Sequence, residues 1–293
     1  ADPFESVYET PGWKRARAAS GRMPRVRALH LPPERPVRDN RGEFCALELD
    51  DGSLGLSYVL LDDTLARLTA EVDRLGLDGA DPLAVARRYA IDSGHWKTVG
   101  FAAANALTRC LFDRAGFRPD DSTDSIGQLN PGLGDHVGMI GLFTPLVGRI
   151  LATGARLTVL ELKAELAGDR EGYRVTLDPG ELSNCTKVIS TSTLLLNDTL
   201  DRVVSCCTGA RAFAMIGPSA GCLPDGLFAR GVTLVGGTWV RDRDTFTAAL
   251  VAGEPLGGHA SKFALSAERY PGWRALVDRA AQAGVARSGD VWC

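Results

Sequence analysis

The chain has 293 residues with 45% hydrophobic and 24% charged side chains and a formal net charge of −3. These values are typical of a globular protein and leave room for two domains. Charges of one sign form no long run and no apolar stretch is long enough to span a bilayer, so the expected partner is a small molecule rather than nucleic acid or membrane. Seven scattered cysteines predict reduced thiols and a cytoplasmic location. Homo-oligomerisation stays open.

The first part of the chain predicts a small antiparallel sheet followed by helices. A weak helical pattern covers residues 4–20. Alternating apolar patterns then predict three strands, at residues 26–31, 44–49 and 53–60. The Asp50-Asp51-Gly52 segment between the last two strands is typical of a hairpin turn. Helical patterns follow at residues 63–75, 81–91 and 97–115. Residues 1–125 are therefore expected to form an α+β domain.

Asn105 stands out within the last of these helices. The helix is rich in small residues around it, from Gly100 to Ala106, which would let another element pack closely. A buried amide requires hydrogen-bond partners. Spacing alone leaves two interpretations open: a buried Asn105 with partners, or an exposed Asn105 on the outer face of the helix.

A polar loop at residues 118–130 separates this part from alternating strand and helix patterns. Strands are predicted at residues 137–143 and 157–160, around Val188 and Ile189, and at residues 212–216 and 232–235. Helical patterns between and after them indicate repeated βα units, hence a mostly parallel, Rossmann-like sheet with helices on both faces. We assign this α/β domain to residues 126–293. Ligands of such sheets bind at the carboxyl ends of the strands.

The stretch from Lys187 to Thr199 carries the strongest signal for a site. A short buried strand meets four consecutive hydroxyl residues, Ser190 to Thr193, and an apolar helical pattern starts at Leu194. A helix N-terminus with free N–H groups and hydroxyls suits an anion or a polar ligand. On a continuous helix, Asn197 would project from the same face as Thr193. A plain helix cap is the alternative, but four hydroxyls are more than a cap requires.

The other strand ends add polar residues to the same expected rim. Glu161 ends a strand 20 residues after Gly141, where an acid can bind a ribose, act as a base or hold a metal. The preceding turn lacks the full G-x-G-x-x-G dinucleotide fingerprint. Cys222 is the one cysteine expected at the rim, where a thiolate could bind a soft metal, although a buried inert cysteine is commoner. The remaining candidates are Phe143, Thr144, Gly217, Pro218 and Ser219.

Several segments together resemble the putative heavy-metal chelation family, whose function is uncharacterised. They are N-A-L at 105–107, V-G-M-I-G-L-F-T-P-L at 137–146, V-L-E-L at 159–162, I-S-T-S-T-L-L-L-N-D-T at 189–199 and I-G-P-S at 216–219. The resemblance implies an enolase-like N-terminal domain, a Rossmann-like C-terminal domain, and a cleft between them for a metal or a metal-chelating molecule. The positions carried over are Asn105, Phe143, Thr144, Glu161, Thr191, Thr193, Asn197, Pro218 and Ser219.

The chain departs from the family pattern at two places near that cleft. Ala220-Gly221-Cys222 replaces a hydroxyl- and proline-rich continuation, and Asp198 stands where a glycine is expected. Both departures allow the ligand to differ from the one that other members bind.

Two functional hypotheses follow. In the first, the protein serves metal homeostasis or metallophore metabolism and binds a divalent transition metal or a metal chelate between the domains. Glu161 and Cys222 would lie near the metal, and Asn105, Phe143, Thr144, Thr191, Ser192, Thr193, Asn197, Gly217, Pro218 and Ser219 near the ligand. The scarcity of clustered His, Cys, Asp and Glu favours an organic chelate over a bare ion. In the second, the chain is a metal-independent or nucleotide-using lyase or transferase with Glu161 as base or ribose ligand. Whether there is turnover stays open.

Overall fold

The small sheet of the protein is an antiparallel meander near its N-terminus. The computed structural model describes residues 23–34, 42–124, 126 and 128–289, so the helix predicted over residues 4–20 lies outside it. The three strands, in the order β1-β2-β3, are β1 (Val26–His30), β2 (Phe44–Leu49) and β3 (Leu54–Tyr58). Their hairpin turn has Gly52 at φ +89°, and Leu49 N donates to Ser53 O at 2.9 Å. The predicted strands and hairpin are confirmed.

Helices cover one face of this small sheet. They are α3 (Thr64–Glu71), the 3₁₀ turn η1 (Val72–Arg74), α4 (Pro82–Ile91) and α5 (Gly94–Arg114). Helix α5 lies so close to β3 that a Cβ on Gly55 would overlap the backbone of Ala102 and Ala106. A Cβ on Gly100 would likewise overlap the backbone of α4 at Tyr89. The small residues of α5 therefore permit the close packing that the sequence predicts.

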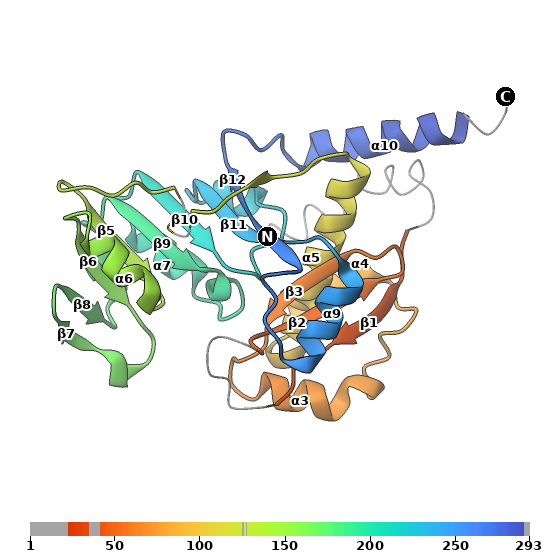
Figure 1. Cartoon of the computed structure of the whole chain (residues 1–293), viewed down its shortest axis with the longest axis horizontal. Helices are drawn as coiled ribbons and strands as arrows, with labels where there is room; N and C mark the ends of the chain where they lie inside the picture. Colours follow the sequence, from red (N-terminus) through yellow and green to blue (C-terminus); the bar gives the residue numbers. More distant parts are fainter. Residues whose placement is uncertain (1–22, 35–41, 125, 127, 290–293) are drawn as a thin grey trace.

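The second, larger sheet has nine strands in the order β4-β12-β11-β10-β9-β5-β6-β8-β7 (Figure 1). Its six central strands, β11 to β8 in that order, pair in parallel, and the edges pair antiparallel. The strands are β4 (Asp120–Asp121), β5 (His136–Ile140), β6 (Arg156–Leu160), β7 (Gly168–Arg170), β8 (Tyr173–Thr176), β9 (Lys187–Thr191), β10 (Ala212–Ile216), β11 (Leu234–Val240) and β12 (Ala260–Ser266).

Alternate residues of the large sheet build two apolar layers, one on each face. One layer joins Val188, Met215 and Val235 to Val203 of α7 (Leu200–Cys206). The other joins Met139 and Ile189 to α6 (Thr144–Leu151). The remaining helical elements are η2 (Ala164–Leu166), η3 (Pro179–Leu182), η4 (Ser192–Leu195), α8 (Asp225–Phe228), α9 (Arg243–Ala252) and α10 (Trp273–Gly289). The predicted α/β class, a mostly parallel sheet with helices on both faces after an α+β unit, is confirmed.

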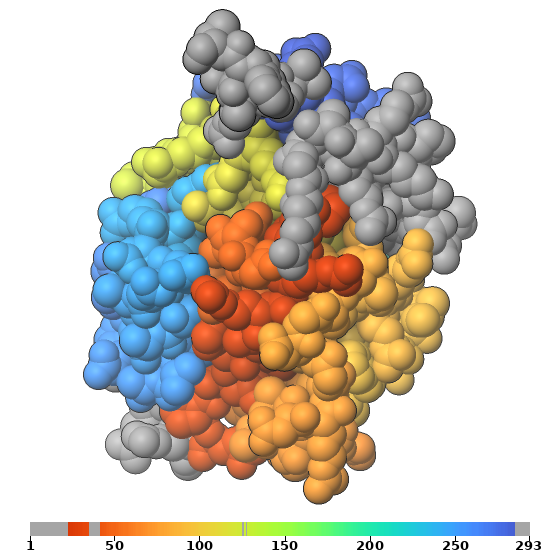
Figure 2. Space-filling model, turned by 90° about the vertical axis from the view of Figure 1, so that its right-hand side faces the viewer, coloured from red at the N-terminus to blue at the C-terminus, as the bar shows by residue number. Residues whose placement is uncertain are grey.

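The two parts of the chain contact each other at several places. Helix α9, which follows β11 of the large sheet, packs on β1 and β2 of the small sheet. In Figure 2 the helix lies beside the small sheet. Helix α10 packs on α5, and β4 joins the large sheet through β12. The division into residues 1–125 and 126–293 stays a prediction. Within the described ranges, no helix is both long and apolar enough to cross a membrane.

Candidate functional site

The strand order of the large sheet gathers most of the predicted site residues at one edge. Strands β6, β5, β9 and β10 are consecutive neighbours and run parallel. Their carboxyl ends therefore lie at the same edge. The last residue of β9, Thr191, and the segments that follow these strands hold the predicted site residues Glu161, Phe143, Thr144, Thr191, Ser192, Thr193, Gly217, Pro218 and Ser219.

The hydroxyl stretch at the end of β9 forms a 3₁₀ turn, η4, in place of the predicted start of a long helix. The Thr193 N–H donates to Thr191 Oγ1 at 3.2 Å, so Thr191 caps the turn. The Thr191 and Thr193 hydroxyls are 2.9 Å apart and hydrogen-bond to each other. Ser192 is buried, whereas Thr191 and Thr193 stay half-buried. Two half-buried threonines with paired hydroxyls therefore lie at the strand end.

The prediction that Thr193 and Asn197 share one helix face is wrong, because the chain is not helical between η4 and α7. Asn197 Oδ1 instead accepts hydrogen bonds from the N–H and the hydroxyl of Thr199. Asp198 has φ +57°, in the left-handed region that glycine adopts readily and aspartate tolerates. This left-handed conformation explains why the family pattern has a glycine at position 198. The Asp198 carboxylate forms an ion pair with Lys97 of α5.

Asn105 is buried, with only 3% of its surface exposed. Its Nδ2 donates to Leu56 O at 2.7 Å and to Ser219 O at 2.9 Å. The amide thus connects α5 to β3 and to the loop after β10. Among the described residues, neither Asn105 Oδ1 nor the buried Ser219 hydroxyl has a hydrogen-bond partner. Of the two interpretations left open by the sequence, the buried one is correct.

Gly217 begins the loop that carries Pro218 and Ser219. Its φ is +149°, and a Cβ at this position would collide with Ser192 Oγ in η4. A side chain at position 217 would therefore push η4 away from the loop after β10. Glycine here lets the ends of β9 and β10 approach each other closely.

The two predicted metal ligands do not suit one shared ion. Both Glu161 carboxylate oxygens accept backbone hydrogen bonds, from Leu142 N at 2.7 Å and Leu162 N at 3.1 Å. Cys222 is buried, and burial raises the pKa of its thiol to about 12. Strands β6 and β10, which precede these residues, are separated by β5 and β9, so their axes lie about 14 Å apart. No group of three or more His, Cys, Asp and Glu suited to a metal occurs in the described part of the chain.

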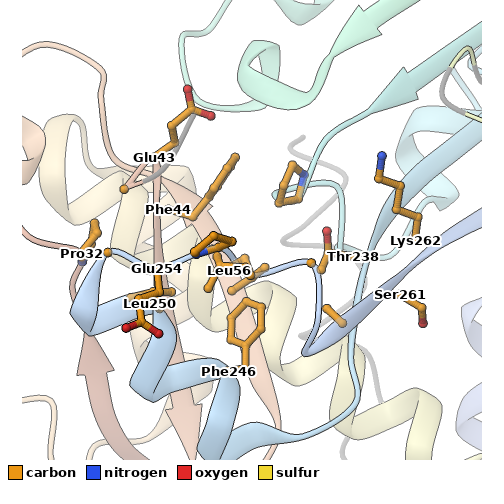
Figure 3. A pocket seen from close by; sticks show the side chains of 17 residues that line it. Pro32, Glu43, Phe44, Leu56, Thr238, Phe246, Leu250, Glu254, Ser261 and Lys262 are labelled. Carbon is orange, nitrogen blue, oxygen red and sulfur yellow. The ribbon is translucent and has the colours of Figure 1, made fainter. Parts of the chain in front are cut away.

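A cavity of about 490 Å³ opens between the small sheet and the β11–β12 side of the large sheet (Figure 3). Its apolar walls come from both parts of the chain and include Phe44, Leu56, Phe246, Leu250 and Leu256. Its polar and charged side chains are Glu43, Thr238, Glu254, Ser261 and Lys262. Of the rim residues predicted from the sequence, Pro218 alone lines this cavity.

Most of the cavity residues were not predicted as site residues from the sequence. Glu43, Thr238 and Lys262 belong to three separate segments, and none of the three was among the site residues predicted from the sequence. To predict the cavity, one would have to know that β2 lies close to β11 and β12, and only the folded chain shows this.

Comparison with known proteins agrees with the resemblance seen in the sequence. Residues 124–266 match the model of the DUF364 family, described as putative heavy-metal chelation. A solved structure of unknown function from this family, from Desulfitobacterium hafniense, superposes with a TM-score of 0.66 at 18% identity, covering 90% of this chain and 100% of that one. A Pyrococcus horikoshii member gives 0.57 at 18% identity, covering 87% and 97%. No curated protein matches the chain.

Proposed function

We propose that the protein binds a small organic metal chelator in the cavity between its two sheets. The starting point is that residues 124–266 match the model of the DUF364 family. The role would lie in metal homeostasis or in the metabolism of such a chelator. Any metal is then coordinated by the organic molecule and is not a cofactor of the protein.

The cavity is the observation that carries this proposal. Its volume of about 490 Å³ lies within the range of small-molecule sites, which are mostly apolar with a few well-placed polar groups. Both parts of the chain contribute walls, as expected of a ligand site between domains. A ligand bound here would contact β2, β3, α9, β11 and β12 together.

The chemistry of Glu161 and Cys222 supports a chelator over direct coordination. The Glu161 carboxylate already holds two backbone N–H groups, and the Cys222 thiol stays protonated near neutral pH. A thiolate, not a thiol, ligates metal. In this proposal the organic molecule supplies the donor atoms, and the chain supplies the apolar walls and charged groups that orient it.

The rim at the carboxyl ends of β5, β6, β9 and β10 remains a second, connected region in the proposal. Pro218 lines the cavity, while its neighbour Ser219 accepts a hydrogen bond from Asn105. A ligand larger than the cavity could reach the Thr191 and Thr193 hydroxyls past Pro218. Mutations at the rim and mutations in the cavity can therefore test the two regions separately.

Native mass spectrometry on untagged protein, purified without added chelators, tests the proposal. Gly257 lines the cavity and Gly258 does not, and a Cβ on either meets nothing within 4 Å. We expect a mass excess of an organic molecule, with or without a metal, in the wild type and in the control Gly258→Trp. It should disappear in Gly257→Trp, which adds a large side chain to the cavity wall.

Two outcomes would count against the proposal. A mass excess that survives Gly257→Trp but is lost in Thr193→Ala would place the ligand at the strand-end rim. A bare protein mass that does not change after addition of divalent metals and chelators would argue against metal handling. Glu161→Gln then becomes the informative variant for the alternative of a metal-independent enzyme.

A further inference from the structure

The charged groups of the cavity lie on opposite sides of it. Glu43 stands at one side and Lys262 at the other, with the Phe44 ring between them, as Figure 3 shows. Glu254 lies on the side of Glu43 (Figure 3). In the described part of the chain, no ion pair involves any of these three residues. The cavity therefore offers a negative side and a positive side to a ligand.

The positive side can hold a carboxylate. Lys262 of β12 lies directly opposite Thr238 of β11 in the antiparallel pair. Directly opposed side chains project from the same face of a sheet, with Cβ atoms about 5 Å apart. The ammonium of Lys262 and the hydroxyl of Thr238 can therefore donate to the two oxygens of one carboxylate.

The negative side can hold a protonated amine. Partial burial raises the pKa of Glu43, because desolvation disfavours the charged form of its carboxyl group. The Phe44 ring beside it packs edge-on against Tyr58, at 5.7 Å between ring centroids. A carboxylate next to an aromatic ring attracts an ammonium group both by its charge and by a cation–π contact.

We propose, on the premise of the function above, that the cavity selects a metal-free aminocarboxylate with an apolar or aromatic body. Its ammonium group lies at Glu43 and Phe44, its carboxylate at Lys262 and Thr238, and its body on Leu56, Phe246 and Leu250. Phosphorylated ligands and nucleotides are disfavoured, because the cavity places two carboxylates against one ammonium.

The same geometry distinguishes the free chelator from its metal complex. An amine that coordinates a metal uses its lone pair for the metal and carries no proton. Only the metal-free form presents an N–H⁺ group to Glu43. A divalent metal should therefore compete with the protein for the ligand.

Titration calorimetry with N-(carboxymethyl)-L-phenylalanine in metal-free buffer tests the ligand class. Lys262→Met should weaken binding about tenfold, the loss of one charge-assisted contact. The derivative with both carboxylates converted to amides should bind the wild type and Lys262→Met equally. Lys163→Met, an exposed lysine outside the cavity, is the matched control and should change nothing.

The amine side is tested in the same way. Glu43→Gln should weaken binding of this probe about tenfold but leave its N-acetyl derivative unaffected, since that compound has no ammonium group. Glu165→Gln, an exposed acid elsewhere, serves as the control. Addition of an equimolar amount of Ni²⁺ should reduce the heat of binding to the wild type.

The outcomes separate this inference from the proposed function. It is overturned if the probe shows no binding at about 10 mM, if Lys262→Met weakens the acid and the amide equally, or if Ni²⁺ leaves binding unchanged. A natural ligand of another class that Gly257→Trp removes in the mass spectrum would leave the proposed function intact. Unchanged probe affinity in Gly257→Trp would instead discard the cavity itself.

Discussion

Asp135 organises the end of the large sheet that lies opposite the candidate site. Its carboxylate, 8% exposed, contacts Lys187 Nζ at 2.9 Å and also pairs with Arg211. The Thr186 hydroxyl and the Gly132 N–H donate to it as well, at 2.9 and 3.0 Å. The amino ends of β5, β9 and β10 thus converge on one buried acid. The hydrogen bond from Lys187 holds the pKa of Asp135 well below its usual range, although burial opposes this shift.

This arrangement predicts a pH-dependent contribution to stability. A carboxyl group whose pKa is lower in the folded than in the unfolded state stabilises the fold above its unfolded pKa of about 4, and loses that effect as the pH falls toward the folded value. Asp135→Asn should therefore lower the free energy of unfolding at neutral pH. The difference from the wild type should shrink below about pH 4.

Urea unfolding followed by circular dichroism at several pH values measures this difference. Asp78→Asn, an exposed acid, is the control and should match the wild type throughout. A deficit in Asp135→Asn that stays constant from neutral to acidic pH would show that the carboxylate charge is not its cause.

The environment of Asn105 could be predicted only in part from the sequence. The helix pattern correctly places this residue in a small-residue helix. Its two partners, Leu56 O and Ser219 O, come from positions 49 and 114 residues away. Spacing within one helix contains no information about such distant carbonyls, so the sequence could not decide between a buried and an exposed amide.

Among the elements, the contact between η4 and the loop after β10 depends on one glycine. Gly217→Ala forces a side chain at φ +149° and against Ser192 Oγ. We expect it to cost about 1–3 kcal/mol of unfolding free energy. The matched control is Gly148→Ala in α6, where a Cβ meets nothing within 4 Å. That change should be neutral or stabilising by about 0.5–1 kcal/mol, since alanine favours a helix.

Urea midpoints of the two variants decide the question, because their predicted effects have opposite signs. Equal midpoints for Gly217→Ala and the wild type would mean that η4 can move aside without loss. The contact would then not hold the strand-end rim in place.

The same region explains which elements the sequence could predict. Apolar strand and helix patterns located most of the elements, because the faces that pack against a neighbouring element are apolar. The pattern failed between Thr193 and Leu200, where Thr191 caps a 3₁₀ turn and Asp198 takes a left-handed conformation. Hydroxyl side chains that bond to nearby backbone compete with helix formation, and apolar spacing does not report this.

For the whole molecule, the apolar cores of the two sheets are shared. Phe101 of α5 is fully buried in the layer that also contains Leu194 and Val203 of the large-sheet part. Conversely, Leu223 and Phe263 belong to the core that surrounds α5. Neither sheet can therefore lose its packing without exposing apolar surface of the other.

This sharing predicts a single cooperative unfolding transition. Differential scanning calorimetry should give equal calorimetric and van't Hoff enthalpies. Phe101→Ala should lower the one midpoint, at a cost of about 3–5 kcal/mol. Leu133→Ala, whose side chain is 88% exposed, should stay within about 0.5 kcal/mol of the wild type. Two resolved transitions, with only one shifted by Phe101→Ala, would contradict this.

The cavity could not be predicted from the sequence, because its walls come together only in the folded chain. The motifs lie at the strand ends, and the rim was predicted from them. The cavity walls instead come from short segments that become neighbours only when α9 packs on the small sheet.

The two edges of the large sheet bear on how copies of the protein could associate. Strand β4 has two residues, both acidic, and β7 has three, including Asp169 and Arg170. All of them are exposed. Short, charged edge strands offer little backbone for an incoming strand and repel continued pairing. These two edge strands therefore disfavour end-to-end growth of the large sheet, and we expect copies of the protein to associate, if they do, through other surfaces.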